Sequence, residues 1–350
     1  MIKDSESQKP SLKNIGVTRR KAISASQEAW VKVGHFSSGK VLPLVIQPAI
    51  EGINLVDWVE KNRRAIESYL LKHGGILFRG FSISSAADFE QFSTAFSTAL
   101  LEYTYRSTPR SKERGNIYTS TEYPADQVIP LHNENAYTSS WPMKIWFFCV
   151  TAARQGGETP IADSRRVFER IDPKIRDHFL QKQVRYVRNY SSGIDLPWQT
   201  VFQTTSKSAV EEYCRSAGIE FEWKNSDHLK TSQVCQAVAR HPQTGEMIWF
   251  NQAHLFHVSS LPAEARETLL STCEEEDLPR NAYYGDGSPI EPAVLDEIRA
   301  VYQQEAVLFP WQEGDILMLD NMLIAHGRSS FVGPRKILVS MAEACSNKNL

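Results

Sequence analysis

The segment KIWFFCVTAA, residues 144–153, is an almost continuous apolar run that ends just before the turn residues Gly156 and Gly157. A run of this length bounded by glycines predicts a strand that is buried on both faces. Other apolar runs of strand length are spread along the chain: VLPLVIQPAI (41–50), which Pro48 ends, GILFRGF (75–81), EMIWFNQ (246–252), DILMLDN (315–321) and RKILVSMAEA (335–344). Together they predict one principal sheet.

Segments with helical periodicity lie between these strands. Residues 53–74 form an amphipathic pattern that stops at Gly74, and residues 85–100 form a second helical pattern. Residues 163–183, beginning near Ser164, and residues 210–218 are predicted helices in the middle of the chain. Because helices cluster early and in the middle while strands frame them, we expect an α+β fold rather than regular βαβ alternation.

The composition excludes several classes of protein. The chain has 350 residues, of which 41% are hydrophobic and 23% are charged, as in ordinary globular proteins. Its net charge of −2 gives no electrostatic basis for binding nucleic acid or an anionic membrane. The five cysteines form no CxxC pair, so we expect them to be reduced and mostly in the core.

The domain organisation is predicted to be simple. Residues 1–25 are polar and rich in lysine and serine, which predicts a mobile tail before a single domain over residues 26–350. No apolar segment has the pattern of a signal peptide or the length of a transmembrane helix, and this favours a cytoplasmic protein. The sequence does not indicate the oligomeric state.

The segment LHNEN, residues 131–135, carries the strongest chemical signal. In an extended chain, residues two apart project from the same face, so His132 and Glu134 are expected to point together while Asn133 points away. A third ligand is available in His326, which follows the apolar strand of residues 315–321. Two imidazoles and one carboxylate leave open positions on an octahedral metal, as in non-haem Fe(II) oxygenases.

Less specific interpretations remain open at this point. An isolated H-x-E arises by chance in many proteins of this size. His254 and His257, in HLFH, are a competing pair of ligands, but no carboxylate accompanies them and the intervening Leu255 and Phe256 are typical of packing.

A wider pattern supports the metal site. The segments GGILFRGF, IPLHNE, GGETPIADSR, HPQTGEMIWFNQ, WQEGDILMLDNMLIAHGR and GPRKILVSM follow one another between about residues 70 and 343. In this order they resemble the Fe(II)/2-oxoglutarate-dependent dioxygenases of the taurine dioxygenase (TauD/TfdA) superfamily, most closely its SyrP-like branch, which includes hydroxylases of nonribosomal peptide pathways. The resemblance implies a double-stranded β-helix, or jelly roll, with flanking helices and a helical insertion over about residues 163–240.

The resemblance also implies Fe(II), 2-oxoglutarate as co-substrate and O2, with His132, Glu134 and His326 as the iron ligands. Glu134 stands where the family more often has aspartate, as it also does in the clavaminate synthase-like members. Thr159, in GGETP, matches the threonine that bonds the distal carboxylate of 2-oxoglutarate. Arg335 is the expected clamp for that carboxylate, although it follows His326 more closely than in relatives, and Arg328 is the alternative.

The substrate residues are predicted with less support. Asn251 follows a strand and faces either the cavity or a strand-end turn, whereas Arg106, Arg110 and Arg165 are candidates to meet an acidic group of the substrate. Two further residues, Asp320 and Asn321, are expected to shape the turn that presents His326.

The implied activity is hydroxylation of an unactivated C–H bond in an amino-acid-type substrate, with release of succinate and CO2. The substrate is either free or tethered to a carrier protein. Glu134 argues against the halogenases of the superfamily, which have a small residue in its place. Desaturation or cyclisation of a small carboxylate remains open, as do a zinc hydrolase, in which the metal activates water, and a non-catalytic jelly-roll binding protein.

Overall fold

The computed structural model describes residues 30–36, 41–97, 99–103, 105, 108, 110–190, 196–224 and 227–347. The predicted mobile tail, residues 1–25, and the substrate candidate Arg106 lie outside the described residues. Within the described part, no helix is both long enough and apolar enough to cross a membrane.

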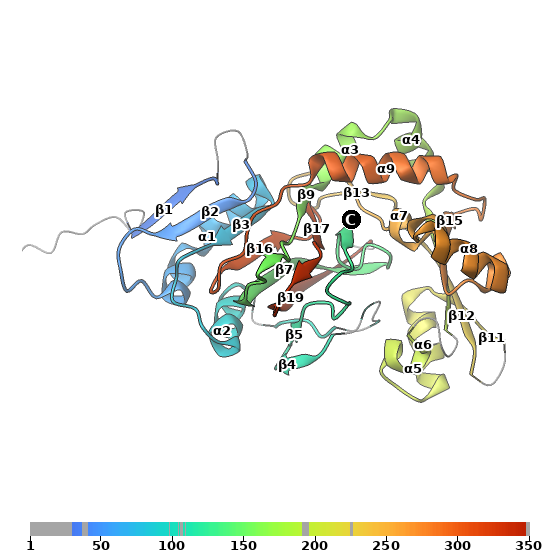
Figure 1. Cartoon of the computed structure of the whole chain (residues 1–350), viewed down its shortest axis with the longest axis horizontal. Coiled ribbons are helices and arrows are strands. Elements are labelled where there is room, and N and C mark those ends of the chain that lie inside the picture. Colours follow the sequence, from blue (N-terminus) through green and yellow to red (C-terminus); the bar gives the residue numbers. More distant parts are fainter. Residues whose placement is uncertain are drawn as a thin grey trace, which may run out of the picture.

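The largest sheet in the described part of the chain has eight strands in the order β1-β2-β3-β16-β7-β19-β5-β4. Its strands are β1 Val31–Gly34, β2 Leu44–Pro48, β3 Gly75–Phe78, β4 Lys112–Arg114, β5 Ile117–Thr119, β7 Ser140–Thr151, β16 Ile316–Asp320 and β19 Lys336–Ser346. The apolar run of residues 144–153 belongs to β7, which pairs antiparallel with β16 on one side and β19 on the other. Five of the six predicted strand runs lie in this sheet, with β7 near its centre (Figure 1). The run of residues 246–252 instead forms β14, Met247–Trp249, which pairs with β13, Val238–Arg240.

Two capped helices cover one face of this sheet. In α1, Leu55–His73, the side chain of Asn54 accepts from the N–H groups of Val56 and Asp57. Gly74 ends α1 in the left-handed region, at φ 72°, where a residue without Cβ is favoured. In α2, Ala86–Phe96, Ser85 and Asp88 form a capping box. Both helices follow the sequence prediction because their start and stop signals are local.

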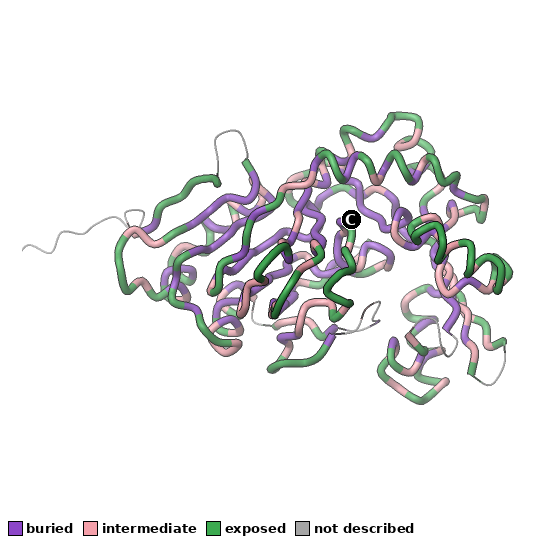
Figure 2. The backbone as a smooth tube through the Cα atoms, in the orientation of Figure 1, coloured by how far each residue is buried: buried purple, intermediate pink, exposed green. Residues whose placement is uncertain are grey.

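Alternate side chains of β7 belong to different cores. Trp146 and Phe148 join the cluster formed with α1 and α2. Ile145, Phe147 and Cys149 face the opposite side and pack in a second cluster. Figure 2 shows that burial is concentrated in these central strands, while the outer helices are largely exposed.

A smaller sheet of three described strands, in the order β6-β17-β9, contributes to the second cluster. Its strands are β6 Ile129–His132, β9 Ile161–Asp163 and β17 Ile324–Arg328. Ile161 and Ile324 of this sheet pack with Ile145 and Phe147 of β7. A short pair, β8 Gln155–Gly156 with β18 Phe331–Val332, lies next to it in the chain. The candidate metal ligands lie on the small sheet and its turns. They face the side of β7 that carries Ile145, Phe147 and Cys149.

The segment predicted as a helical insertion, about residues 163–240, contains both helices and strands. Its helices are α3 Ser164–Arg170, α4 Pro173–Lys182, α5 Trp198–Phe202 and α6 Lys207–Ala217. Its strands are β10 Val184–Tyr190, β11 Glu220–Trp223, β12 Leu229–Cys235 and β13 Val238–Arg240. The sequence prediction of a helical insertion did not include these strands. In β10 and β12 buried and more exposed residues alternate, a strand pattern that their arginine, lysine and asparagine residues conceal.

The predicted helix over residues 163–183 is two helices. Asp172 caps the second helix and Pro173 occupies its first turn. An N–H group at this position would have no acceptor within the helix, so proline removes no helical hydrogen bond there. The first helix ends at Arg170, so the Asp-Pro step separates α3 from α4.

The strands β11, β12 and β10 continue into β15, Arg280–Tyr284, to make a four-stranded sheet in the described residues. The remaining elements are β14 Met247–Trp249, α7 Ala253–Phe256, α8 Ala263–Thr272, α9 Pro292–Glu305 and two 3₁₀ turns, η2 Val258–Ser260 and η3 Glu275–Asp277. All five cysteines are free, and four of them are buried, as the sequence predicted.

Candidate metal centre and its cavity

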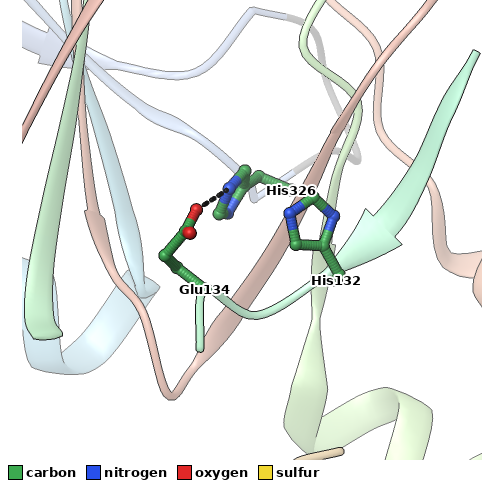
Figure 3. A group of neighbouring side chains, drawn as sticks. All are labelled: His132, Glu134 and His326. Carbon is green, nitrogen blue, oxygen red and sulfur yellow. Dashed lines mark ion pairs between the residues drawn. The ribbon is translucent and has the colours of Figure 1, made fainter. Parts of the chain in front are cut away.

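Two histidines face each other across neighbouring strands. In the register of β6 with β17, His132 lies opposite His326, and the centroids of their rings are 4.7 Å apart. Glu134 lies in the turn after β6, where its Oε2 is 3.8 Å from Nε2 of His326 (Figure 3). One ligand atom from each of the three side chains lies within 4.8 Å of the others. The structure thus brings together the three residues that the sequence predicted as metal ligands.

The local route to this cluster differs from the sequence argument. β6 ends at His132, so Glu134 reaches the cluster from a turn and not from the same face of an extended strand. Asn133 does point away, as expected. Its Nδ2 donates to the carbonyl oxygen of Asn321 and to Oγ of Ser164, both in buried surroundings.

His132 is held in the form that binds a metal. Its Nδ1 lies 2.8 Å from the carbonyl oxygen of Pro130, and because a carbonyl only accepts, Nδ1 carries the proton. Nε2 therefore keeps its lone pair. Burial, followed by the effect of His326, lowers the pKa of His132 to about 4, so the ring is neutral at physiological pH. A neutral imidazole whose other nitrogen is fixed by a carbonyl is the usual state of a histidine ligand.

Glu134 is ionised. Burial by itself raises the pKa of its carboxyl group, but the charge of Arg110 and the neighbouring His326 lower it by more, so the pKa lies far below its ordinary value. Nη2 of Arg110 donates to Oε2 of Glu134 at 2.8 Å, and both side chains are buried. Two imidazoles and one carboxylate form a donor set that fits a divalent first-row metal.

The turn between β16 and β17 holds the main chain of Glu134. Oδ1 of Asn321 accepts from the N–H of Glu134 at 2.7 Å, and Nδ2 of Asn321 donates to the Glu134 carbonyl oxygen at 2.9 Å. Oδ1 of Asp320 accepts from the N–H groups of Met322 and Leu323. The prediction that Asp320 and Asn321 shape this turn is confirmed, and Asn321 also fixes the turn that carries Glu134.

Three buried polar residues support the same segments, and of these the sequence singled out only His254, as a competing ligand. Nε2 of His241 donates to Oδ2 of Asp320 at 3.0 Å. Nε2 of Gln252 donates to the Asn133 carbonyl oxygen at 2.7 Å, and Nε2 of His254 donates to that of Leu131 at 2.9 Å. In sequence His241 and Gln252 are ordinary polar residues near β14, and no spacing rule distinguishes them from surface residues. His254 is thus a support of the ligand strand.

A small cavity of about 30 Å³ adjoins two of the three candidate ligands. It is lined by His132 and His326, by Phe147 of β7, and by Thr159 and Arg335. Arg110 and Arg328 also line it. The Phe147 ring lies 5.0 Å from that of His326, so the wall beside the histidine is apolar.

The two arginines considered for the 2-oxoglutarate clamp have different surroundings. Arg328 donates through Nη1 to the carbonyl oxygens of Thr121 and Tyr123, and through Nη2 to those of Pro124 and Gln127. Its terminal nitrogens hold the loop before β6, which disfavours Arg328 as the alternative clamp.

Arg335 faces the cavity with most of its donors available. Its Nε donates to the carbonyl oxygen of Gly157 at 2.8 Å, and its Nη1 lies 3.4 Å from Oγ of Ser120. Burial, followed by the nearby charge of Arg328, lowers the pKa of Arg335 to about 10, which still leaves it charged at neutral pH. A half-buried cation that faces a cavity is suited to an anionic ligand.

The GGETP segment is shaped around Arg335. Gly157 has φ 72°, and a Cβ there would lie 2.9 Å from Cβ of Ala153 and 3.0 Å from Cδ of Arg335. Glycine is therefore required where the guanidinium stem passes the turn. Oγ1 of Thr159 accepts from Nε1 of Trp311 at 3.1 Å, which fixes the hydroxyl beside the same cavity.

The remaining substrate candidates lie elsewhere. Nδ2 of Asn251 donates to the carbonyl oxygen of Ala237 and its Oδ1 accepts from the N–H of Ala253, so Asn251 has the turn role that the sequence left open. Arg165 pairs with Asp163 and Glu246 and does not line the cavity. These contacts favour structural roles for both residues.

Comparisons with known proteins agree with this arrangement. The chain is 45% identical over 278 residues to the dapdiamide synthesis protein DdaC of Enterobacter agglomerans, covering 79% of this chain and 84% of the relative. It is 30% identical over 329 residues to the clavaminate synthase-like protein At3g21360 of Arabidopsis thaliana, covering 88% of this chain and 96% of the relative.

A solved structure shares the fold. PvcB of Pseudomonas aeruginosa superposes with a TM-score of 0.50 at 15% identity, over 85% of this chain and 84% of that protein. The sequence profile of the family described as "Taurine catabolism dioxygenase TauD, TfdA family" matches residues 39–341. This match spans most of the chain and includes all three clustered residues, and the chain therefore belongs to the TauD, TfdA family of dioxygenases.

Proposed function

We propose that this protein is an Fe(II)- and 2-oxoglutarate-dependent oxygenase that hydroxylates an unactivated C–H bond of an amino-acid-type substrate. The observation that carries the proposal is the cluster of His132, Glu134 and His326 beside a cavity that also contains Arg335. PvcB, which shares the fold, is described as an Fe, alpha-ketoglutarate dependent oxygenase from an isonitrile synthetic pathway. Membership of the dioxygenase family supports the same chemistry here.

The candidate ligands and the residues that line the cavity have different roles. His132, Glu134 and His326 would hold the iron, which together with 2-oxoglutarate supplies the oxidation of a C–H bond by O2, with release of succinate and CO2. The protein's share is to orient the substrate and to exclude water, and the apolar Phe147, Ile129 and Ile337 at the cavity wall serve that purpose.

Arg335 and Thr159 would bind the distal carboxylate of 2-oxoglutarate. Arg335 presents guanidinium donors to the cavity, and guanidinium matches the geometry of a carboxylate. Thr159 contributes a hydroxyl that Trp311 already orients.

The finer description of the fold is also a proposal. We assign the eight-stranded sheet and the small β6-β17-β9 sheet as the two sheets of a double-stranded β-helix, with α1 and α2 packed outside. The described residues between 30 and 347 then form one domain around that core. Its free, mostly buried cysteines fit a reducing compartment, and we place the activity in the cytoplasm.

An anaerobic titration tests the iron and 2-oxoglutarate assignment. Addition of Fe(II) and 2-oxoglutarate to the protein without oxygen is expected to produce a weak visible charge-transfer band that needs all three components. Zn(II) in place of Fe(II) serves as the control and gives no band. A protein that binds neither Fe(II) nor 2-oxoglutarate under these conditions would be a hydrolase or a binding protein instead.

The form of the substrate is a further part of the proposal. A relative that is 45% identical is named as a dapdiamide synthesis protein, which supports an amino-acid-type substrate. A substrate tethered to a carrier protein needs an opening near the metal. Asn135, next to Glu134 in the chain, lines a cavity of about 420 Å³ together with Tyr213 and Ser216 of α6, but this cavity shares no described lining residue with the one beside His132 and His326. The tethered form therefore rests on the relative alone.

Free and tethered forms are distinguished by supplying the same amino acid in both ways. The product is followed as a 16-dalton gain in mass that accompanies succinate in a one-to-one ratio, as hydroxylation requires. We expect the carrier-loaded form to be converted faster at equal concentration. Equal or better conversion of the free amino acid would remove the carrier from the proposal and leave the iron chemistry unchanged.

A further inference from the structure

Arg110 is a buried arginine whose donors are mostly unused. It lies two residues before the start of β4 and is 7% exposed. It lines the same cavity as His132 and His326. Its Nη2 donates to Glu134, but its Nε and Nη1 are buried and find no acceptor among the described residues. Buried N–H groups without a partner are rare in folded proteins, because each loses its hydrogen bonds to water without replacement.

The guanidinium is held in a defined orientation. The ion pair with Glu134 fixes one end of the group, and its central carbon lies 4.3 Å from the centroid of the Tyr103 ring. A flexible arginine would turn its free donors to water, whereas this one is fixed by a carboxylate on one side and an aromatic face on another. Its unused donors are therefore a permanent feature of the cavity.

The other two cavity arginines differ from Arg110, although the buried Nε of Arg328 also finds no acceptor among the described residues. Arg328 uses both terminal nitrogens on carbonyl oxygens of the loop before β6. Arg335 is assigned to 2-oxoglutarate. Of the three described arginines that line the cavity, Arg110 is thus the one with donors left for a different ligand.

The charges in the cavity point to the same conclusion. Its described lining contains three arginines and no carboxylate, and Glu134 next to it offsets only one of the three charges. The charges of Fe(II) and 2-oxoglutarate are equal and opposite, so binding both leaves the positive excess unchanged. A buried positive excess is stabilised by an anion.

We propose that Arg110 binds a carboxylate of the substrate. The inference rests on the proposed function and names the chemical class of its substrate: a small molecule that carries a carboxylate near the C–H bond to be oxidised. Glu134 is compatible with this role, since a carboxylate has about four lone-pair sites and accepts from Arg110 while offering an oxygen to a metal. For a carrier-bound substrate, the carboxylate would be one other than the group joined to the carrier.

A small fluorinated anion tests this site without knowledge of the substrate. The full-length protein is loaded with Mn(II), which supports no turnover, and saturated with 2-oxoglutarate so that Arg335 is occupied. Trifluoroacetate is then titrated, and fluorine NMR relaxation reports its binding near the paramagnetic metal. Trifluoroacetamide, which has no charge, is the matched probe, and bound Mn(II) is measured separately by electron paramagnetic resonance.

We expect saturable relaxation with trifluoroacetate and at least several-fold weaker binding of the amide. Arg110→Met should weaken trifluoroacetate binding by about tenfold or more at equal bound Mn(II), because a charge-assisted hydrogen bond is lost. Arg110→Lys keeps the charge without the planar donors and should fall between the two. Arg240→Met, which replaces an exposed arginine, should behave as the unchanged protein.

Two results would overturn the assignment: no saturable binding of trifluoroacetate to the unchanged protein, or binding that is the same in Arg110→Met. Failure of the unchanged protein to bind Mn(II) would be a different outcome, because it removes the metal centre of the proposed function and with it the inference built on that centre. Loss of Mn(II) binding in Arg110→Met, with trifluoroacetate binding intact in Arg110→Lys, would assign Arg110 to positioning Glu134 instead.

Discussion

We expect His326→Ala and His132→Ala each to abolish metal-dependent succinate formation while the protein stays folded. Either change leaves two protein donors where three are clustered within 4.8 Å, and two donors do not hold Fe(II) against a competing chelator. We expect a loss of turnover by at least about a hundredfold, on the order expected when a catalytic metal is lost. Metal content after dialysis, the charge-transfer band and circular dichroism measure binding, assembly and fold separately.

The control is His178→Ala, which replaces an exposed histidine on α4. This variant should bind metal and form succinate as the unchanged protein does. The His326 ring contacts Phe147, and His132 donates to the carbonyl oxygen of Pro130, but neither histidine belongs to the hydrophobic core clusters. Their replacement should therefore change the melting temperature little. Full turnover by either ligand variant would show that the cluster is not the catalytic centre.

Arg335→Met raises the concentration of 2-oxoglutarate needed for half-maximal turnover. Removing one partner of a buried charge pair costs roughly 2–5 kcal/mol, which corresponds to an increase on the order of a hundredfold or more. Arg335→Lys should recover part of the affinity, because it restores the charge but not the planar donors. The half-saturating concentration of 2-oxoglutarate, followed both by turnover and by the anaerobic charge-transfer band, is the measurement.

Arg328→Met provides the comparison for this prediction. Arg328 holds four carbonyl oxygens of the loop before β6, so its removal should lower stability and leave the affinity for 2-oxoglutarate much less affected. The opposite pattern, with Arg335→Met neutral and Arg328→Met weakening 2-oxoglutarate binding, would transfer the clamp to Arg328.

Elements whose signals are local were predicted well. The apolar run in β7, the Asn54 cap and Gly74 end of α1, and the capping box of α2 each depend on a few neighbouring residues. The strands β10 and β12 were missed because their alternation carries arginine, lysine and asparagine, and these side chains become buried only when the four-stranded sheet assembles. Burial of polar residues is a property of the assembled fold.

The sequence by itself determined the chemistry of the site: the types of residue at His132, Glu134 and His326, and the family pattern around them. Tertiary structure decided how they meet, because Glu134 arrives through a turn that Asn321 holds from a distant part of the chain. It also decided which arginine is available. Arg110, Arg328 and Arg335 cannot be told apart in the sequence, because hydrogen bonding depends on which groups are neighbours in three dimensions. In the folded protein the terminal nitrogens of Arg328 donate to carbonyl oxygens, whereas donors of Arg110 and Arg335 face the cavity.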